Sequence, residues 1–315
     1  MSNSVSIIGG GAWGVALAAA AARAGASSLL YTRRTTNGAL PDGVKTTASL
    51  AEAAKHARLL VLAVPSGAAA EVARELGDHT GGAHYVVHGV RGLSGEALET
   101  ISEVVRKETP VRRVGALGGP ALSDDLLHGR PSVIVCGSLF PEVTESFTQG
   151  FGSPTLRVYP TNDLVGLEWA SALVGGLTIA VGFAQGIGMS AGLVAAFISR
   201  SVGEASRIAA AAGGEEKTLL GLAGYGDLLA STSQMERPEV ILGRELAKGT
   251  KLADAMGAAK LRVEAIELVP RVVAFAERHK VRAPIFKALG EGILGGKGAE
   301  ALLKDLMSQP IAESA

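Results

Sequence analysis

The sequence predicts an α/β domain with a doubly wound parallel sheet, followed by a second domain that is all-helical. Up to Pro160, short apolar runs typical of buried strands alternate with alanine-rich segments typical of helices. Such alternation implies parallel βαβ units. Beyond Pro160 the strand-like runs largely vanish and helical periodicity takes over, with breakers such as Pro238 and Pro284. We therefore expect one domain over residues 1–160 and another over residues 161–315.

The expected strands follow from β-branched and apolar runs bounded by turn residues. They lie near residues 5–9, 28–31, 59–63, 85–88, 113–117, 132–136 and 155–159. Helices are expected between them, for example over Val15 to Ala24, Leu50 to Lys55 and Ala68 to Leu76.

The first strand runs directly into a glycine-rich turn, Gly9-Gly10-Gly11-Ala12-Trp13-Gly14. In this pattern Gly9 permits a tight turn, Gly11 lets a pyrophosphate approach the backbone, and Gly14 lets the following helix lie close to the strand. The amides at the helix N-terminus would face the phosphates. The strand–turn–helix context predicts a Rossmann-type dinucleotide site that includes Ala12 and Trp13. A glycine-rich turn in some other α/β protein is the alternative.

The end of the second strand bears on the choice of cofactor. Ser28 to Tyr31 is followed by Arg33 and Arg34, and no carboxylate occurs between Arg23 and Asp42. An NAD site usually has an acidic residue near this point, whereas arginine favours the 2′-phosphate of NADP. We expect NADP or NAD, with the two arginines favouring NADP. The alternative is that they are solvated loop charges, or that Arg33 stacks on the adenine of either cofactor.

Composition limits the other function classes. The 315 residues hold 30 basic and 30 acidic side chains, so no nucleic-acid partner is implied. The single cysteine, Cys136, excludes an intramolecular disulfide, suits a reducing cytoplasm, and lies in an apolar run that predicts a buried strand. No secretory signal is expected. No metal site is expected either, because no His, Cys, Asp and Glu set has ligand spacing.

One segment raises the possibility of a membrane-associated protein. Residues 169–199 carry no charge, and a long apolar stretch can span a bilayer. The stretch also holds many glycines and hydroxyl or amide residues, without an aromatic belt or flanking basic cluster. Two buried helices around Gly186-Ile187-Gly188 therefore fit better, and no membrane contact is expected.

Several motifs over nearly the whole chain occur in a fixed order. Besides the glycine turn they are Ala63-Val-Pro-Ser66, Arg91-Gly-Leu93, Gly119-Pro-Ala-Leu122, His128-Gly-Arg-Pro131, Asp163-Leu-Val-Gly-Leu-Glu168 and Gly221-Leu-Ala-Gly-Tyr-Gly-Asp-Leu228. In these motifs the chain resembles the bacterial type of NAD(P)-dependent glycerol-3-phosphate dehydrogenase. The resemblance implies hydride exchange between a nicotinamide and a 2-hydroxy or 2-keto phosphate, and a homodimer. It also implies cofactor contacts from Val64, Pro65 and Glu264.

The chain departs from this family at central polar positions. The resemblance implies a lysine where Arg91 stands, a catalytic lysine followed by asparagine at Val174-Gly175, and an Arg-Asn pair at Pro238-Glu239. Arginine stays protonated and valine has no proton to exchange. The loss of one proton-transfer group typically costs about 10²–10⁴-fold in rate. We therefore expect the fold of this family, but these departures leave the identity of the substrate undecided.

Candidate replacements remain at the site. Asp227 is expected to be a catalytic carboxylate presented to a cleft, with helix capping as the alternative. Arg91 would bind or polarise the substrate, and His88, at a strand end, could donate a proton. Arg237 and Arg200 are candidates for an anionic substrate, although Arg200 could equally be a charge on a helix surface.

These observations predict a cytoplasmic oxidoreductase that exchanges a hydride between NAD(P)H and a small carbonyl, such as glycerone phosphate or a diverged substrate. Two rivals remain, a non-catalytic dinucleotide-binding sensor or scaffold and the membrane-associated protein.

Overall fold

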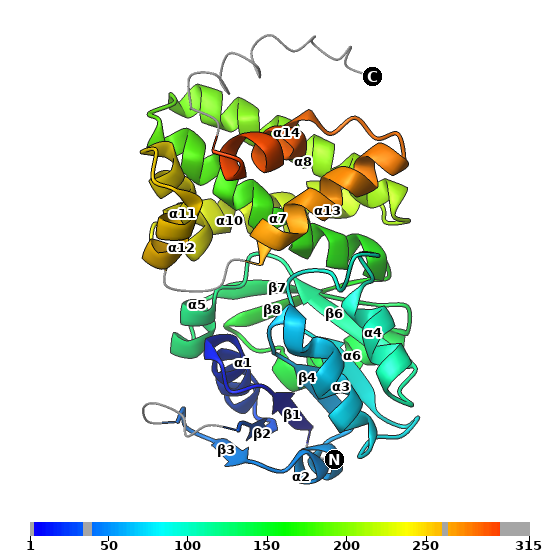
Figure 1. Ribbon diagram of the computed structural model, residues 1–315. Coiled ribbons are helices and arrows are strands. Elements are labelled where there is room, and N and C mark those ends of the chain that lie inside the picture. The colour runs from blue at the N-terminus through cyan, green and yellow to red at the C-terminus, as the bar shows by residue number, and fades with distance from the viewer. Residues whose placement is uncertain (1–2, 34–39, 260–263, 297–315) are drawn as a thin grey trace.

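The computed structural model describes residues 3–33, 40–259 and 264–296 and contains the two expected domains (Figure 1). The first is an α/β sandwich, and the second is helical, which confirms the predicted fold class. The strands are β1 (Ser4–Ile8), β2 (Ser27–Tyr31), β3 (Val44–Thr47), β4 (Leu59–Leu62), β5 (Tyr85–His88), β6 (Arg113–Gly118), β7 (Ser132–Ser138) and β8 (Leu156–Thr161).

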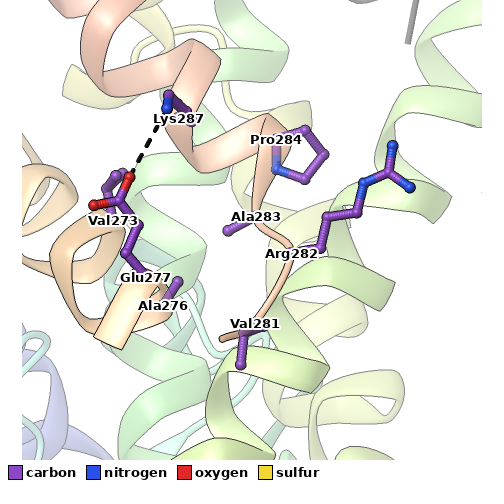
Figure 2. Close-up of a pocket in the computed structure, with 8 residues that line it drawn as sticks. All are labelled: Val273, Ala276, Glu277, Val281, Arg282, Ala283, Pro284 and Lys287. Atoms are coloured by element: carbon purple, nitrogen blue, oxygen red, sulfur yellow. Dashed lines mark ion pairs between the residues drawn. The ribbon is translucent and has the colours of Figure 1, made fainter. Parts of the chain in front are cut away.

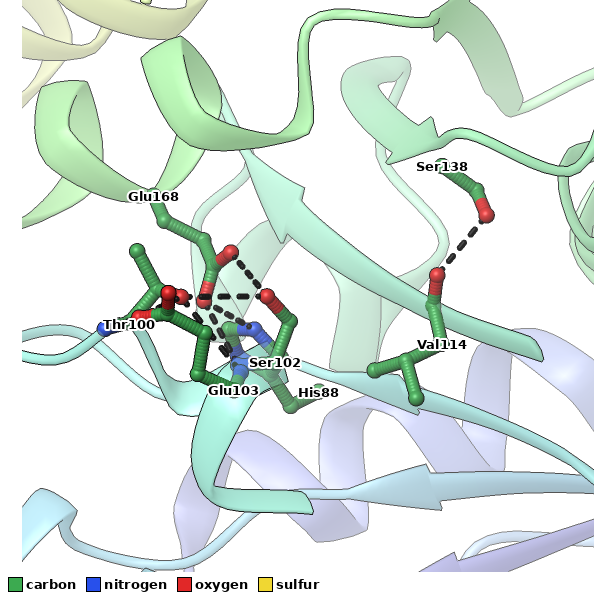
Figure 3. Close-up of polar contacts among 7 residues, drawn as sticks. All are labelled: His88, Thr100, Ser102, Glu103, Val114, Ser138 and Glu168. Carbon is green, nitrogen blue, oxygen red and sulfur yellow. Dashed lines mark hydrogen bonds and ion pairs between the residues drawn. The ribbon is translucent and has the colours of Figure 1, made fainter. Parts of the chain in front are cut away.

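These strands form one sheet in the order β3-β2-β1-β4-β5-β6-β7-β8. Every adjacent pair is parallel except β6 and β7, which are antiparallel and place Gly115 opposite Ser138. The Ser138 hydroxyl also donates to the Val114 carbonyl at 2.7 Å (Figure 3). The expectation of uniformly parallel units was therefore wrong for β7. The short helix α5 (Ser123–His128) between β6 and β7 packs beside α1 (Ala12–Arg23), so the chain does not make the long crossover that a parallel return needs.

The sequence analysis missed β3. Its Val44-Lys-Thr-Thr47 segment is short, and only Val44 is buried. It lies at the sheet edge against β2. Because an edge strand needs little apolar surface, such a segment has a weak signal in the sequence.

Helices cover both faces of the sheet. One core layer joins α1 and α6 (Pro141–Phe151) to inward-facing strand residues such as Val5 and Ile7. The opposite layer joins α2 (Leu50–His56), α3 (Ala69–Gly77) and α4 (Ile101–Glu108) to the next residue of β1, Ile8. This alternation is the two-residue period of a strand buried on both faces. Cys136 lies in the first layer and is fully buried, as expected for a strand residue.

The second domain begins after β8 with a long central helix. Its elements are α7 (Leu164–Gly186), α8 (Ala191–Ala211), α9 (Glu216–Leu220), the π-helical η2 (Leu222–Gly226), α10 (Asp227–Ser233), α11 (Pro238–Ala247), α12 (Leu252–Ala259), α13 (Ala265–Arg278), α14 (Pro284–Lys287) and the π-helical η3 (Ala288–Leu294). The change from strands to helices falls between Thr161 and Leu164. The division at residues 160 and 161 stays a prediction.

Asp163 fixes the start of α7. Its carboxylate accepts hydrogen bonds from the Gly166 and Glu215 amides, each at 2.9 Å, and from the Thr218 hydroxyl. It therefore caps α7 and also holds the start of α9 beside it.

Helix α7 explains the charge-free segment. It is long and apolar enough to cross a membrane, but 94% of its most apolar window is buried in the protein. Its glycines allow close contact with α11, since a Cβ on Gly182 would lie 2.8 Å from the Val240 carbonyl oxygen. The expected break near Gly186 is present, because α7 ends there and Gly188 has φ +74° before α8 begins. These features favour a core helix over a membrane span.

A second buried carboxylate, Glu204 of α8, holds the chain at the start of α14. Its two oxygens accept from the Ile285 and Phe286 amides at 3.0 and 2.8 Å. Burial raises the pKa of Glu204 to about 7, although these amides and Arg207 oppose the shift.

Candidate active site

The glycine turn connects β1 to α1 in the way the motif requires. Gly9 has φ +131°, and a Cβ there would lie 2.1 Å from the Ala63 carbonyl oxygen. A Cβ on Gly14 would lie 1.8 Å from the Gly9 carbonyl oxygen. These two glycines therefore let α1 sit close to β1 and β4. A Cβ on Gly11 would meet no atom within 4 Å, so the space above it is open to a ligand.

That open space belongs to a cleft of about 580 Å³ between the two domains. The residues that line it come from the turns at the carboxyl ends of β1, β4, β5 and β6 and from the helical domain. In an open α/β sheet, ligands bind at this end of the strands. The predicted site residues that line the cleft are Gly11, Ala12, Trp13, Val64, Pro65, Arg91, Arg237 and Glu264.

The Trp13 side chain forms one wall of the cleft. Its indole nitrogen lies 2.4 Å from the position that a Cβ on Gly89 would take. Only a glycine at residue 89 therefore leaves room for this ring. The pair connects the turn after β1 with the turn after β5.

Arg91 and Asp227 join the two domains at the cleft. Arg91 Nη2 donates to Asp227 Oδ1 at 2.9 Å, and the Ser231 hydroxyl donates to the same oxygen at 3.2 Å. Asp227 is fully buried, whereas 35% of the Arg91 side chain is exposed. Burial opposes the charge of Arg91, but attraction to Asp227 outweighs it and raises the pKa of the arginine.

This pair leaves hydrogen-bonding capacity unused. Arg91 Nη1 and Asp227 Oδ2 are buried, and neither has a partner among the described residues. Asp227 begins α10, which directly follows the π-helical η2, and its side chain makes no capping hydrogen bond. The capping alternative for Asp227 was therefore wrong.

A second ion pair lies beside the first. Arg237 Nε donates to Glu239 Oε2 at 3.0 Å, and the two side chains are only 12% and 19% exposed. Burial lowers the pKa of Arg237, and repulsion from Arg91 lowers it further. The two guanidinium groups therefore lie at the same end of the cleft.

Glu264 closes the cleft from the helical side. Its Oε1 accepts from the Ser66 amide at 2.9 Å, in the turn after β4. Gly92 has φ +116°, and a Cβ there would lie 3.2 Å from Glu264 Oε2. The glycine after Arg91 is thus needed for the turn and for this close approach.

Arg33 lies at the end of β2, as the sequence predicts, and is exposed. It forms ion pairs with Glu75 at 3.3 Å and Glu71 at 4.0 Å, both on α3. A hydrogen bond with Tyr31 is the largest of the effects that raise its pKa. Arg34 lies outside the described residues.

His88 and Arg200 are not among the residues that line the cleft, and neither are Asp227, Arg33, Gly9 and Gly14. His88 is buried, and its Nε2 lies 2.9 Å from Glu168 Oε1 (Figure 3). Glu168 also accepts from the Ser102 amide at 2.8 Å and from its hydroxyl at 2.6 Å. This network ties α7 to β5 and α4, so it favours a structural role for His88 over proton donation. Arg200 is exposed on α8, away from the residues that line the cleft.

Sequence reasoning missed three neutral polar residues of the cleft, which are Ser123 at the start of α5, Ser171 of α7 and Gln234 before α11. Ser171 lies in the charge-free segment, and the apolar residues around it gave no sign in the sequence that it faces a cleft. Val174, one turn further along, is 2% exposed and belongs to the apolar core. No group of three or more potential metal-binding side chains occurs in the described part of the chain.

A second cavity, of about 310 Å³, lies between α13 and α14 (Figure 2). Its lining is mostly apolar, with an ion pair between Glu277 and Lys287 at 3.8 Å across it. None of the predicted site residues lines this cavity.

Comparison with known proteins agrees with this geometry. Residues 4–143 match the family model of the NAD-dependent glycerol-3-phosphate dehydrogenase N-terminus, and residues 163–304 match the model of its C-terminus. A glycerol-3-phosphate dehydrogenase [NAD(P)+] of Moorella thermoacetica is 31% identical over 98% of this chain and 97% of its own length. The chain belongs to this family. A Fusobacterium nucleatum relative of the same name is 29% identical over 96% of both chains.

The solved glycerol-3-phosphate dehydrogenase of Coxiella burnetii has the same fold, with a TM-score of 0.88 and 23% identity over 98% of this chain and 99% of its own. Family membership confirms the predicted oxidoreductase and its use of NAD or NADP. The alternative of a non-catalytic sensor is not favoured.

Proposed function

We propose that this chain transfers a hydride between NADPH, or NADH, and a small carbonyl compound or its alcohol. The observation that supports the proposal is the cleft of about 580 Å³, which is lined by the open glycine turn and by Arg91, the partner of the buried Asp227. A volume of this order holds a cofactor end and a small substrate.

The residues present fit a dinucleotide. Gly11 offers the backbone without a side chain, and Ala12, Trp13, Val64 and Pro65 form apolar walls beside it. The nicotinamide supplies the hydride when it is bound. Arg33 would meet the 2′-phosphate of NADP, because its ion pairs with Glu71 and Glu75 are exposed and such pairs hold a side chain weakly.

Arg91 and Asp227 would handle the reacting oxygen. Arg91 stays protonated, so it would hold the carbonyl oxygen and stabilise the negative charge that develops there. The free Arg91 Nη1 donates and the free Asp227 Oδ2 accepts, which are the two partners that one substrate hydroxyl requires. In the oxidation direction Asp227 Oδ2 would take the hydroxyl proton, and in reduction it would return that proton.

The relatives' name makes glycerone phosphate the first compound to test. We expect slow reduction or none, because Val174 is buried in the apolar core and supplies neither the charge nor the proton of the lysine that the resemblance implies there. Asp227 alone would have to serve the reacting oxygen. Robust turnover of glycerone phosphate by the unmodified protein would refute this expectation. It would mean that Arg91 and Asp227 suffice for the reaction.

The proposal is tested with purified protein, NADPH and a panel of small carbonyls with and without phosphate. We expect at least one to be reduced, and Asp227→Asn to lose turnover while NADPH binding stays unchanged. Arg200→Gln, exposed on α8, is the control and should alter neither. An Asp227→Asn variant as active as the unmodified protein would overturn the assignment of Asp227.

We also propose a cytoplasmic homodimer without nucleic-acid or membrane partners. The balanced charge and the single buried cysteine support the compartment and the lack of nucleic acid. Leu220, Tyr225 and Leu229, which are 56%, 42% and 42% exposed on α9 to α10, support an interface with a second copy. Sedimentation velocity would test this, and a monomer at micromolar concentration would argue against it.

A further inference from the structure

Glu168 of α7 holds both ends of the connection that carries Arg91. This connection leaves β5 at His88 and enters α4, whose second residue is Ser102. Glu168 Oε1 lies 2.9 Å from His88 Nε2 and accepts from the Ser102 amide at 2.8 Å, and Glu168 Oε2 accepts from the Ser102 hydroxyl at 2.6 Å (Figure 3). A side chain of the helical domain therefore closes the neck of a loop that belongs to the sheet domain.

This network is buried, so its loss would be costly. The side chains of His88 and Glu168 are each 1% exposed, and Ser102 is buried beside them. Without the carboxylate, the Ser102 amide and hydroxyl would lose their partner inside the protein. His88 Nδ1 has no hydrogen-bond partner among the described residues, so the ring depends on its contact through Nε2. Glu168 is therefore the group that fixes His88.

Apolar contacts hold the middle of the same connection. Leu93 and Leu98 follow β5 in the chain, yet both are buried in the core of the helical domain. Leu98 has φ +56°, a left-handed conformation that a leucine keeps only where the surrounding contacts hold it. On the exposed side, Arg271 of α13 donates to the Gly95 carbonyl at 3.3 Å. The helical domain thus fixes this connection along its length, and Arg91 lies within it.

We propose that Glu168 is a positioning residue of the reaction. It acts through His88 and Ser102, and it places Arg91 where that arginine can hold the reacting oxygen. The inference rests on the proposed function, which gives Arg91 this task. Arg91 follows His88 by three residues, and Ser171 follows Glu168 by three, so the network lies next to two residues that line the cleft. Because a misplacement of about 1 Å can cost about 100-fold in rate, a loosened connection should reduce turnover more than it reduces folding.

The test compares variants of this network with a control outside the connection. Glu168→Leu removes the carboxylate, whereas Glu168→Gln is the conservative variant, because its amide oxygen still accepts and its amide nitrogen can donate to the Ser102 hydroxyl. His88→Leu removes only the anchor at the start of the connection, and it decides the test if Glu168→Leu does not fold. The matched control is Ser138→Ala, which removes a buried hydrogen bond to the Val114 carbonyl (Figure 3).

Two measurements report on the placement of Arg91. Without cofactor, the rate at which phenylglyoxal modifies Arg91 is followed by mass spectrometry, with Arg23 of α1 as the internal reference. With NADPH, kcat and KM are measured for the panel carbonyl that the unmodified protein reduces fastest. The Kd of NADPH should stay unchanged, because the glycine turn lies outside the connection and the Gly89 amide donates to the Leu62 carbonyl at 2.8 Å within the sheet.

We expect Glu168→Leu and His88→Leu to raise the modification rate of Arg91 and to lower kcat/KM by about tenfold or more. Glu168→Gln should lie closer to the unmodified protein. Ser138→Ala should change neither quantity, even where it lowers the unfolding temperature. An unchanged modification rate or an unchanged kcat/KM in the two leucine variants would overturn the inference, and so would an equal change in Ser138→Ala.

The two measurements also separate this inference from the proposed function. If the unmodified protein reduces no compound of the panel, the proposed function is refuted. The modification rates would then still decide whether Glu168 places Arg91, because they need neither cofactor nor turnover.

Discussion

Gly11 offers the sharpest separation of ligand binding from folding. A Cβ there meets no atom within 4 Å, and the backbone has φ −74° and ψ 174°, which valine adopts readily. Gly11→Val changes the N-cap of α1, which costs at most about 1 kcal/mol of folding stability. Its branched side chain would fill the space that the pyrophosphate needs. We therefore expect dinucleotide binding to be abolished in a folded protein.

The assay is a pair of thermal unfolding curves, with and without NADPH, beside a fluorescence titration that uses Trp13 in the cleft wall. NADPH at about 100 times its Kd should add about 2.7 kcal/mol to the stability of the unmodified protein. The same addition should leave Gly11→Val unchanged, and its circular dichroism spectrum should stay near normal.

Gly14→Ala is the matched control, because it adds a smaller group to the same turn. Its Cβ would lie 1.8 Å from the Gly9 carbonyl oxygen, so β1 and α1 would have to separate. Overpacking of this kind costs about 1–3 kcal/mol or more. Gly14→Ala should thus lower stability without ligand, unlike Gly11→Val. Undiminished NADPH binding by Gly11→Val would mean that the glycine turn serves folding alone.

Three further changes test other parts of the molecule. NADPH should bind more tightly than NADH, and Arg33→Asp should reverse the order in a fluorescence titration; equal affinities that the change does not alter would refute the role of Arg33. Val174→Lys should lower the unfolding temperature more than Val174→Met does, since it adds a charge at a position only 2% exposed; equal temperatures would contradict this burial. Because the pKa of Glu204 is about 7 in the folded chain and near 4.5 unfolded, the folded state holds more protons between these values. Stability should therefore fall by about 3 kcal/mol as pH rises through that window, and Glu204→Gln should flatten the profile in urea unfolding; an unchanged slope would show that other groups cause it.

The parts of the fold that the sequence could predict depend on short-range patterns. The glycine turn needs residues 9, 11 and 14 at fixed spacing, and in the structure Gly9 and Gly14 allow the close approach of α1 to the strands while Gly11 borders open space. The alternation of strands and helices is likewise local, and it yielded seven of the strand positions. The edge strand β3 and the direction of β7 could not be read, because they depend on which surface a segment packs against.

The site was predictable only as a set of candidates, since its pairs connect distant residues. Arg91 and Asp227 are 136 positions apart, and His88 and Glu168 are 80 apart. His88 ends β5 and Arg91 follows it. Only the arrangement of α7 and α10 decides which of the two faces the cleft. His88 meets Glu168 beneath the surface, whereas Arg91 reaches Asp227 at the cleft wall.

The charge of the cleft shows the same limit more strongly. Arg237 and Pro238-Glu239 are adjacent in the sequence, and counted singly they suggest a cation for an anionic substrate followed by a repelling carboxylate. In the structure Glu239 is bound to Arg237 within the first turn of α11, so the two act as one neutral group. A pocket recognises a substrate by the charges left unpaired in it. Because pairing is set by side-chain geometry, the order of residues in the sequence does not reveal which charges of this cleft stay unpaired.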